Sequence, residues 1–192
     1  MPRPRSSWNP VPLSAYNFPM PIILPFEGHN PRVDDAIFIA ESATITGDVE
    51  LAPGTSIWYG AVLRGDTNII RVGENTNIQD VCVLHGDADW PVIVGNRVTV
   101  GHGAILHGCQ IEDDCLIGMA SVIMNGCIVG AGSIVAGGTV LAPGTKIPPR
   151  SLVVGVPGKI RREVSQEEID GLIRHSWKVY LELAERNRRS GK

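Results

Sequence analysis

The chain has few aromatic residues, little net charge and no long apolar stretch. Aromatic side chains make up only 5% of its 192 residues, so aliphatic and small side chains must fill the core. The net charge of −3 gives no basic surface for nucleic acid or an anionic membrane, and we expect neither as a partner. No uninterrupted apolar run reaches the roughly 18 residues that a membrane-spanning helix needs.

We also expect no secretory leader. The N-terminal stretch is rich in proline as far as Pro25 and lacks the apolar segment of a signal peptide. This composition favours a cytoplasmic protein.

The chain instead has an aliphatic residue at every sixth position over much of its length. An α-helix repeats its apolar face every 3.6 residues and a half-buried strand every two, so a period of six predicts short strands that turn at regular intervals. The pattern is typical of an all-β fold, a parallel β-helix of hexapeptide repeats. The repeat positions are Ile39, Ile45, Leu51, Ile57, Leu63 and Ile69, and later Ile111, Ile117, Ile123, Val129, Val135, Leu141, Ile147 and Val153.

The phase of the repeat slips between these two series. Val72, Ile78 and Leu84 come three residues late, a ten-residue step leads to Val94, Val100 and Leu106, and a five-residue step restores the phase at Ile111. In a regular solenoid such irregularities mark places where function has been added. We therefore expect the functional site in this region.

The four cysteines fit the repeat without a disulfide. Cys82, Cys115 and Cys127 each lie four places after an aliphatic repeat residue, at the position that Ala, Ser or Thr fills elsewhere. We interpret them as small core residues. Cys109 lies outside this spacing.

Three segments follow from this pattern. Residues 1–31 hold eight of the 14 prolines and predict an extended lead-in along the solenoid or a neighbouring subunit, and residues 32–158 form the repeat body. Residues 159–192 predict a helix packed against a flat face of the solenoid, begun by a capping box of Ser165 and Glu168. Its apolar stripe consists of Ile169, Leu172, Ile173, Trp177, Tyr180 and Ala184.

Three of the five histidines lie in the region where the repeat slips: His85, His102 and His107. Neutral imidazole is the commonest zinc ligand, and three histidines with an open fourth position are typical of a catalytic metal site. Three unrelated surface histidines are the plainer alternative. His29 and His175 stand alone, and we interpret them as structural or solvent-facing.

The spacing of the histidines predicts how they meet. His85 and His107 each follow a repeat leucine and are 22 residues apart, which is one coil plus the four extra residues of the irregular step, so they should stack on adjacent coils. His102 lies two residues after its repeat residue, Val100, and five residues before His107. This places it about one face of the coil before His107. Because Zn–N bonds are only about 2.0–2.1 Å long, His102 of the same chain should not reach that metal. We therefore predict a homotrimer whose metal lies between subunits, with His102 supplied by a neighbour.

The chain from about Pro31 resembles the γ-class carbonic anhydrases and their relatives, which are left-handed β-helical homotrimers with a C-terminal helix. The resemblance lies in four motifs in order: LRGD (63–66), NIQD (77–80), VLHGD (83–87) and GHGAILHG (101–108). The hexapeptide repeat alone would not separate this family from acyltransferases. The handedness of the coil is implied by the resemblance alone.

The resemblance implies a role for each matching residue. His85, His102 and His107 would hold a zinc, iron or cobalt ion. Arg64 and Asp80 would form an ion pair across the subunit boundary, with Asp66 in the same network. Gln79 would orient the attacking hydroxide, and Tyr180 would approach the pocket.

The implied reaction is the reversible hydration of carbon dioxide to bicarbonate. The active members of the family carry an acidic loop whose glutamate transfers the proton. The matching stretch here, residues 86–92, reads GDADWPV and offers Asp87 and Asp89 but no glutamate.

Two other function classes remain open from the sequence. A hexapeptide acyltransferase or thioesterase acting on an acyl-CoA could use one histidine as a general base without a metal. A non-catalytic trimeric scaffold would need none of the ligands. Three converging histidines favour a metal over a single base.

Overall fold

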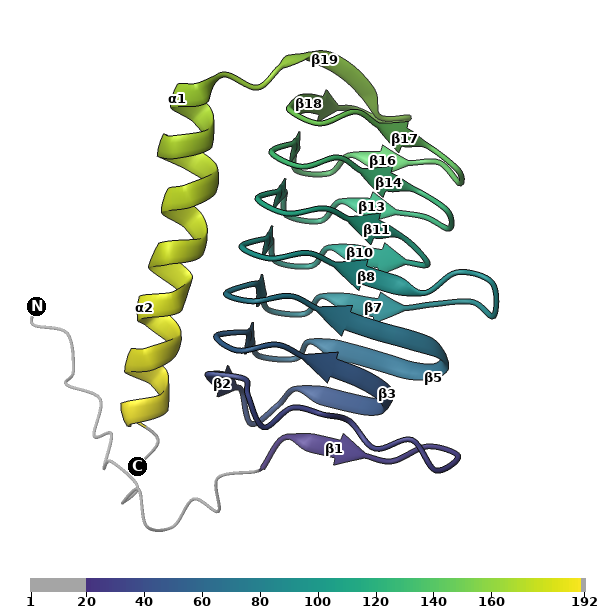
Figure 1. The fold of residues 1–192 in the computed structure, drawn as a ribbon, viewed down its shortest axis with the longest axis vertical. Coiled ribbons are helices and arrows are strands. Elements are labelled where there is room, and N and C mark those ends of the chain that lie inside the picture. Colours follow the sequence, from purple (N-terminus) through teal and green to yellow (C-terminus); the bar gives the residue numbers. More distant parts are fainter. Residues whose placement is uncertain (1–19, 191–192) are drawn as a thin grey trace, which may run out of the picture.

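Short parallel strands wind into a solenoid in the computed structural model, which describes residues 20–190, and a long helix runs along one side (Figure 1). This confirms the predicted β-helix with a helix packed alongside. The first 19 residues of the predicted lead-in lie outside the described part. No helix within residues 20–190 is long and apolar enough to cross a membrane.

The elements follow one another along the whole described chain. The strands are β1 (Ile22–Leu24), β2 (Phe38–Ile39), β3 (Thr44–Leu51), β4 (Ser56–Ile57), β5 (Val62–Val72), β6 (Asn77–Ile78), β7 (Val83–His85), β8 (Val92–Val94), β9 (Thr99–Val100), β10 (Ile105–His107), β11 (Gln110–Ile111), β12 (Leu116–Ile117), β13 (Val122–Ile123), β14 (Ile128–Val129), β15 (Ile134–Val135), β16 (Val140–Leu141), β17 (Lys146–Ile147), β18 (Ser151–Val154) and β19 (Lys159–Glu163). The helices are α1 (Gln166–Glu168), the π-helical turn η2 (Ile169–Ile173) and α2 (Arg174–Ser190).

The strands form two sheets, which together make up the three faces of the coil. In the first sheet, β7, β10, β13 and β16 stack on the start of β5, where residues 62–64 pair with β7. The strands β8, β11, β14 and β17 stack on its end, where residues 70–72 pair with β8, so β5 continues around the corner between two faces. The second sheet is the third face and runs β2, β4, β6, β9, β12, β15, β18, β19. In the regular part, equivalent residues pair 18 positions apart, as Ile111 with Val129 and Ile117 with Val135 do.

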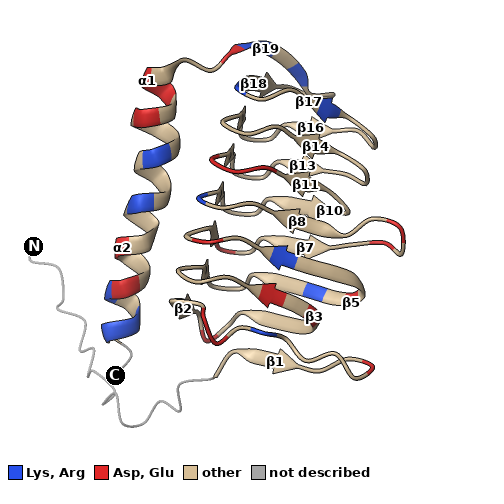
Figure 2. Cartoon of the chain, in the orientation of Figure 1, with Lys and Arg blue, Asp and Glu red and all other residues tan. Residues whose placement is uncertain are grey.

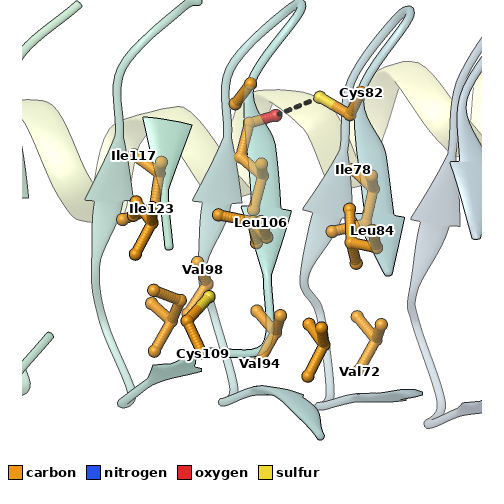
Figure 3. Close-up of a cluster of buried hydrophobic side chains, with 14 of the residues drawn as sticks. Val72, Ile78, Cys82, Leu84, Val94, Val98, Leu106, Cys109, Ile117 and Ile123 are labelled. Atoms are coloured by element: carbon orange, nitrogen blue, oxygen red, sulfur yellow. Dashed lines mark hydrogen bonds between the residues drawn. The ribbon is translucent and has the colours of Figure 1, made fainter. Parts of the chain in front are cut away.

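The repeat residues fill the inside of the coil (Figure 3). Ile78, Leu84, Leu106 and Ile117 are fully buried, as the period of six predicts. One predicted repeat residue is wrong: Ile69 is only half-buried, and the core residue is its neighbour Ile70. The reason is that β5 continues through the corner as one strand of 11 residues, which changes the inward-facing position.

The cysteines are all buried and reduced within the described residues. Cys82, Cys115 and Cys127 occupy the small-residue positions that the repeat predicts, and Cys109 is buried as well. The thiol of Cys82 donates to the carbonyl oxygen of Gly101 on the next coil (3.2 Å). The thiols therefore serve packing between coils.

Charged residues lie mostly at the corners between strands and along the helix (Figure 2).

The coils come so close at one corner that a Cβ at Gly47 would overlap the carbonyl oxygen of Gly65, and Gly47 has a φ of 76°. Only glycine combines that backbone conformation with that contact.

The ends of the described chain depart in part from the predicted segments. β1 lies in the predicted lead-in and pairs in parallel with β3. Residues 159–163, which we assigned to the helical segment, form β19 antiparallel to β18. After the cis Val156–Pro157 bond the chain turns back along the last coil, whose open edge offers hydrogen bonds that a helix there would leave unused.

The C-terminal helix begins as predicted. Ser165 is the N-cap, and its side chain and that of Glu168 bond each other's backbone N–H groups. Ile169 and Ile173 pack with Ile134 and Val164 in a second apolar cluster between the helix and the solenoid. The prediction that Leu172 belongs to the apolar stripe of the helix is wrong. Its side chain is 47% exposed, because the π-helical turn rotates it away from the sheet.

Candidate metal centre

The irregular region of the repeat brings two histidines together on adjacent coils. β7 and β10 are parallel neighbours, and His85 pairs directly with His107. The four extra residues form a loop between β7 and β8, closed by the bridge between Asp87 and Trp90. The predicted stacking of His85 on His107 is therefore confirmed.

The two imidazoles face each other with one nitrogen each. Nδ1 of His85 lies 3.1 Å from Nε2 of His107. Two nitrogens bound to one tetrahedral zinc at about 2.0–2.1 Å would lie roughly 3.3 Å apart. The pair thus has the spacing of two ligands of a single ion.

Each of these rings is held from its far side by an oxygen. Nε2 of His85 lies 3.1 Å from Oδ1 of Asp66, and Nδ1 of His107 lies 2.6 Å from Oδ1 of Asn125. An oxygen acceptor fixes the ring proton on the far nitrogen and leaves the near nitrogen bare. Two bare nitrogens that point at each other have the chemistry to bind one cation together.

Asp66 is itself held by Arg64. The guanidinium donates to both carboxylate oxygens, at 2.9 and 2.7 Å. Partial burial of Asp66 raises the carboxyl pKa, but hydrogen bonds and charge attraction from Arg64, with hydrogen bonds from His85 and Thr67, leave this pKa below its usual range. Asp66 therefore remains a carboxylate beside His85.

His102 lies on another corner of the coil, after β9 in the second sheet. Its Nδ1 is 2.7 Å from Oδ2 of Asp80, and its Nε2 is 3.2 Å from the hydroxyl of Tyr180 on α2. Within residues 20–190 no three His, Cys, Asp or Glu side chains of the chain gather closely enough to hold a metal ion. The single chain thus joins two of the three predicted ligands and leaves His102 apart.

Gln79 lies beside His102 and is almost completely buried. Its Oε1 accepts from the backbone N–H of His102 (3.2 Å), and its amide nitrogen donates to Oδ1 of Asn77 (3.1 Å). These two bonds fix the orientation of the amide. One of its two amide hydrogens remains available for another acceptor.

Arg64 and Asp80 do not meet within one chain. Arg64 is bonded to Asp66, two residues further along β5, and Asp80 is bonded to His102. The ion pair between them therefore stays a prediction about neighbouring subunits.

Asn125 is a site residue that the sequence analysis missed. It contacts His107 through Oδ1 and lies 18 residues after it, which is one regular coil. That spacing is the signal that could have found it, because side chains one coil apart stack in a β-helix.

This architecture defines a class, the hexapeptide-repeat proteins with a left-handed β-helix. A family model described as "Bacterial transferase hexapeptide (six repeats)" matches residues 108–143. A hexapeptide transferase family protein from Anaplasma phagocytophilum has a solved structure that superposes with a TM-score of 0.80 at 38% identity, over 85% of this chain and 96% of that chain.

Sequence relatives narrow the class to a family. A Methanocaldococcus jannaschii protein named "Probable carbonic anhydrase" is 51% identical over 147 residues, which are 77% of this chain and 92% of that protein. Gamma carbonic anhydrase 2 of Arabidopsis thaliana mitochondria is 42% identical over 162 residues, 81% of this chain and 58% of that longer protein. The chain belongs to the γ-class carbonic anhydrase family.

Proposed function

We propose that this protein catalyses the metal-dependent, reversible hydration of carbon dioxide to bicarbonate. The observation that carries the proposal is the pair of facing nitrogens, Nδ1 of His85 and Nε2 of His107, at 3.1 Å. His102 from a neighbouring subunit is the third ligand in this proposal, and zinc is the expected ion, with iron or cobalt as alternatives. Such an ion is a Lewis acid that makes hydroxide available near neutral pH.

A trimer around the metal sites is supported by the apolar surface beside them. Val83 and Ile105 precede the histidines on β7 and β10, point outward, and are 37% and 38% exposed. Val81, four residues before His85, is 60% exposed. Water-exposed apolar side chains beside an incomplete site favour a covering protein surface. A second copy of this chain would cover them and bring His102.

Other residues of the chain orient the attacking oxygen and hold the histidine ligands in this proposal. Gln79 has one free amide hydrogen with which to orient the attacking oxygen as it approaches the carbon of carbon dioxide. Asp66 and Asp80 hold His85 and His102 by their far nitrogens, and Arg64 neutralises Asp66. Tyr180 closes the pocket from α2.

Metal stoichiometry tests the shared site. Wild-type protein loaded with zinc should hold one ion per chain, and His102→Ala should hold none although His85 and His107 remain paired within each chain. The matched control is His29→Ala, since the side chain of His29 is exposed and its Nδ1 lies 3.7 Å from Oδ2 of Asp48. Full metal content in His102→Ala would overturn the shared site.

Stopped-flow hydration of carbon dioxide tests the activity. Wild-type protein loaded with zinc, or with iron under anaerobic conditions, should hydrate carbon dioxide well above the buffer rate, and His107→Ala should not. If neither metal gives a rate above buffer, carbonic anhydrase activity is ruled out for this protein.

An acyltransferase acting on an acyl-CoA is the second candidate, and one observation favours it. A groove of about 400 Å³ runs between α2 and the second sheet, lined by His102, Tyr180, Ile134 and Ala136 among others. An apolar groove beside a histidine could hold an acyl chain next to a general base. The test supplies acetyl-CoA with an added amine or alcohol as acceptor, and transfer to water would count as thioesterase activity. Thiol release that is lost in His102→Ala but unchanged after metal removal would favour this candidate.

A further inference from the structure

Asn125 connects one histidine of the candidate metal centre to a carboxylate on a different coil. Its Oδ1 lies 2.6 Å from Nδ1 of His107, and its Nδ2 donates to Oδ2 of Asp87 at 2.5 Å. The three residues lie on three successive coils, 38 residues apart from end to end. Neither the motifs nor the reaction assigns them a common role.

The chemistry of these groups fixes which atom of Asn125 faces which partner. A carboxylate offers only acceptors, so the NH₂ group of the amide must face Asp87. The carbonyl oxygen must then face His107, and since it accepts only, Nδ1 of His107 must carry the ring proton. Nε2 is left bare, and this is the nitrogen that points at His85.

The surroundings hold this arrangement in place. A Cβ at Gly108 would lie 2.6 Å from Oδ1 of Asn125 and 2.7 Å from Cβ of Trp90, so only glycine leaves the amide room to reach the ring. The loop that carries Asp87 is tied down from the preceding coil, because Nδ2 of Asn68 donates to the carbonyl oxygens of Asp87 (3.0 Å) and Ala88 (2.8 Å).

Trp90 fixes the other end of the loop between β7 and β8. A Cβ at Gly126 would lie 3.0 Å from two carbons of its ring, so the indole lies directly on the backbone beside Asn125. The loop is thus fixed to the coils before and after it, and Asp87 is held where it can orient the amide.

We infer that Asn125, oriented by Asp87, is a positioning residue that locks His107 in the tautomer whose bare Nε2 binds the cation. The inference rests on the proposed metal site. It gives the short loop a role different from proton transfer, that of fixing a ligand. Removal of an outer partner of a metal-bound histidine typically lowers metal affinity about 10- to 100-fold, and we expect a loss of that size.

Two measurements on Asn125→Leu test the inference. Zinc affinity, from competition with a chromophoric chelator, should fall about 10- to 100-fold. The ¹⁵N spectrum of the metal-free protein should show the wild-type His107 ring protonated at Nδ1 and the variant ring as a mixture of tautomers. The matched control is Asn96→Leu, because Asn96 also donates to an aspartate of the next coil, Asp113, but touches no histidine. It should leave both readouts unchanged.

An exchange of the two side chains separates the role of Asn125 from general stability. Asp87→Asn combined with Asn125→Asp keeps the pattern, because position 125 can then accept from both the ring and the amide at position 87. We expect this double variant to keep the wild-type Nδ1–H signal and zinc affinity, because a carboxylate at position 125 accepts from the ring as the amide oxygen does. If Asn125→Leu fails to fold, loss of the Nδ1–H signal in the folded double variant would contradict the inference.

The outcomes also distinguish this inference from the proposed function. If wild-type protein binds no metal, the metal site is wrong, and the tautomer signal still reports whether Asn125 fixes the ring. If wild-type protein binds zinc and Asn125→Leu binds it equally with an unchanged His107 tautomer, the inference is overturned while the metal site stands.

Discussion

The hydroxyl of Tyr180 lies 3.2 Å from Nε2 of His102, so the C-terminal helix reaches the nitrogen that Asp80 leaves bare. Burial, followed by the charges of Asp80 and Cys82, raises the pKa of Tyr180, so its hydroxyl stays protonated at neutral pH and donates to the ring. His102 then carries its proton on Nδ1, towards Asp80. All three candidate ligands thus have their ring proton directed to an oxygen and one bare nitrogen directed away from it.

Tyr180→Phe should strengthen metal binding. The hydroxyl competes with the cation for Nε2 of His102, and the net value of such a hydrogen bond is about 1 kcal/mol. Its removal should raise zinc affinity about fivefold, measured by chelator competition with wild-type protein in parallel. Weaker zinc binding in Tyr180→Phe would mean that the hydroxyl supports the site instead of competing for the ligand.

Gly47→Ala should strongly destabilise the solenoid. The added Cβ would overlap the carbonyl oxygen of Gly65, and the φ of 76° is unfavourable for any side chain. We expect a loss of about 3 kcal/mol or more in the free energy of unfolding, measured with guanidinium chloride. Gly138→Ala is the control, because Gly138 has a φ of 68° but open space around its Cβ position, and it should lose only about 1–2 kcal/mol. Equal losses in Gly47→Ala and Gly138→Ala would show that the contact with Gly65 does not affect stability.

A pair of leucines tests where the core ends. Leu141 is fully buried in the coil and Leu172 is 47% exposed on the π-helical turn. Leu141→Ala should lower the free energy of unfolding by about 2–5 kcal/mol, and Leu172→Ala by no more than about 0.5 kcal/mol. A large loss in Leu172→Ala, measured in the same denaturation experiment, would contradict the rotation of Leu172 away from the sheet.

The buried thiols predict how stability depends on alkaline pH. Burial raises the pKa of Cys82 from 9.0 to about 11 and that of Cys115 to about 12. Because the unfolded thiols ionise near pH 9 and the folded ones do not, their contribution to the free energy of unfolding should be constant up to about pH 8 and fall between about pH 9 and pH 12.

Denaturation at a series of pH values measures this fall, and Cys82→Ala should show a smaller one. The native cysteines should also resist an aromatic disulfide reagent at pH 8 and react once the chain is unfolded. Rapid reaction of the native protein would contradict the burial of the thiols.

Much of the fold was predictable because a β-helix is built from local repeats. Each coil packs only on its neighbours, so the spacing of aliphatic residues fixes which side chains point inward. Ile78, Leu84 and Leu106 follow from that spacing alone, and so does the stacking of His85 on His107. The capping box of Ser165 and Glu168 is equally local.

The period of the sequence predicts the coil, its core and the two histidines that stack within one chain. The folded structure adds that Ile70 lies in the core in place of Ile69, that residues 159–163 form a strand, and that Asn125 holds His107. These features depend on where a strand bends at a corner and on contacts between coils. No periodic pattern encodes them, because they arise where the period is broken.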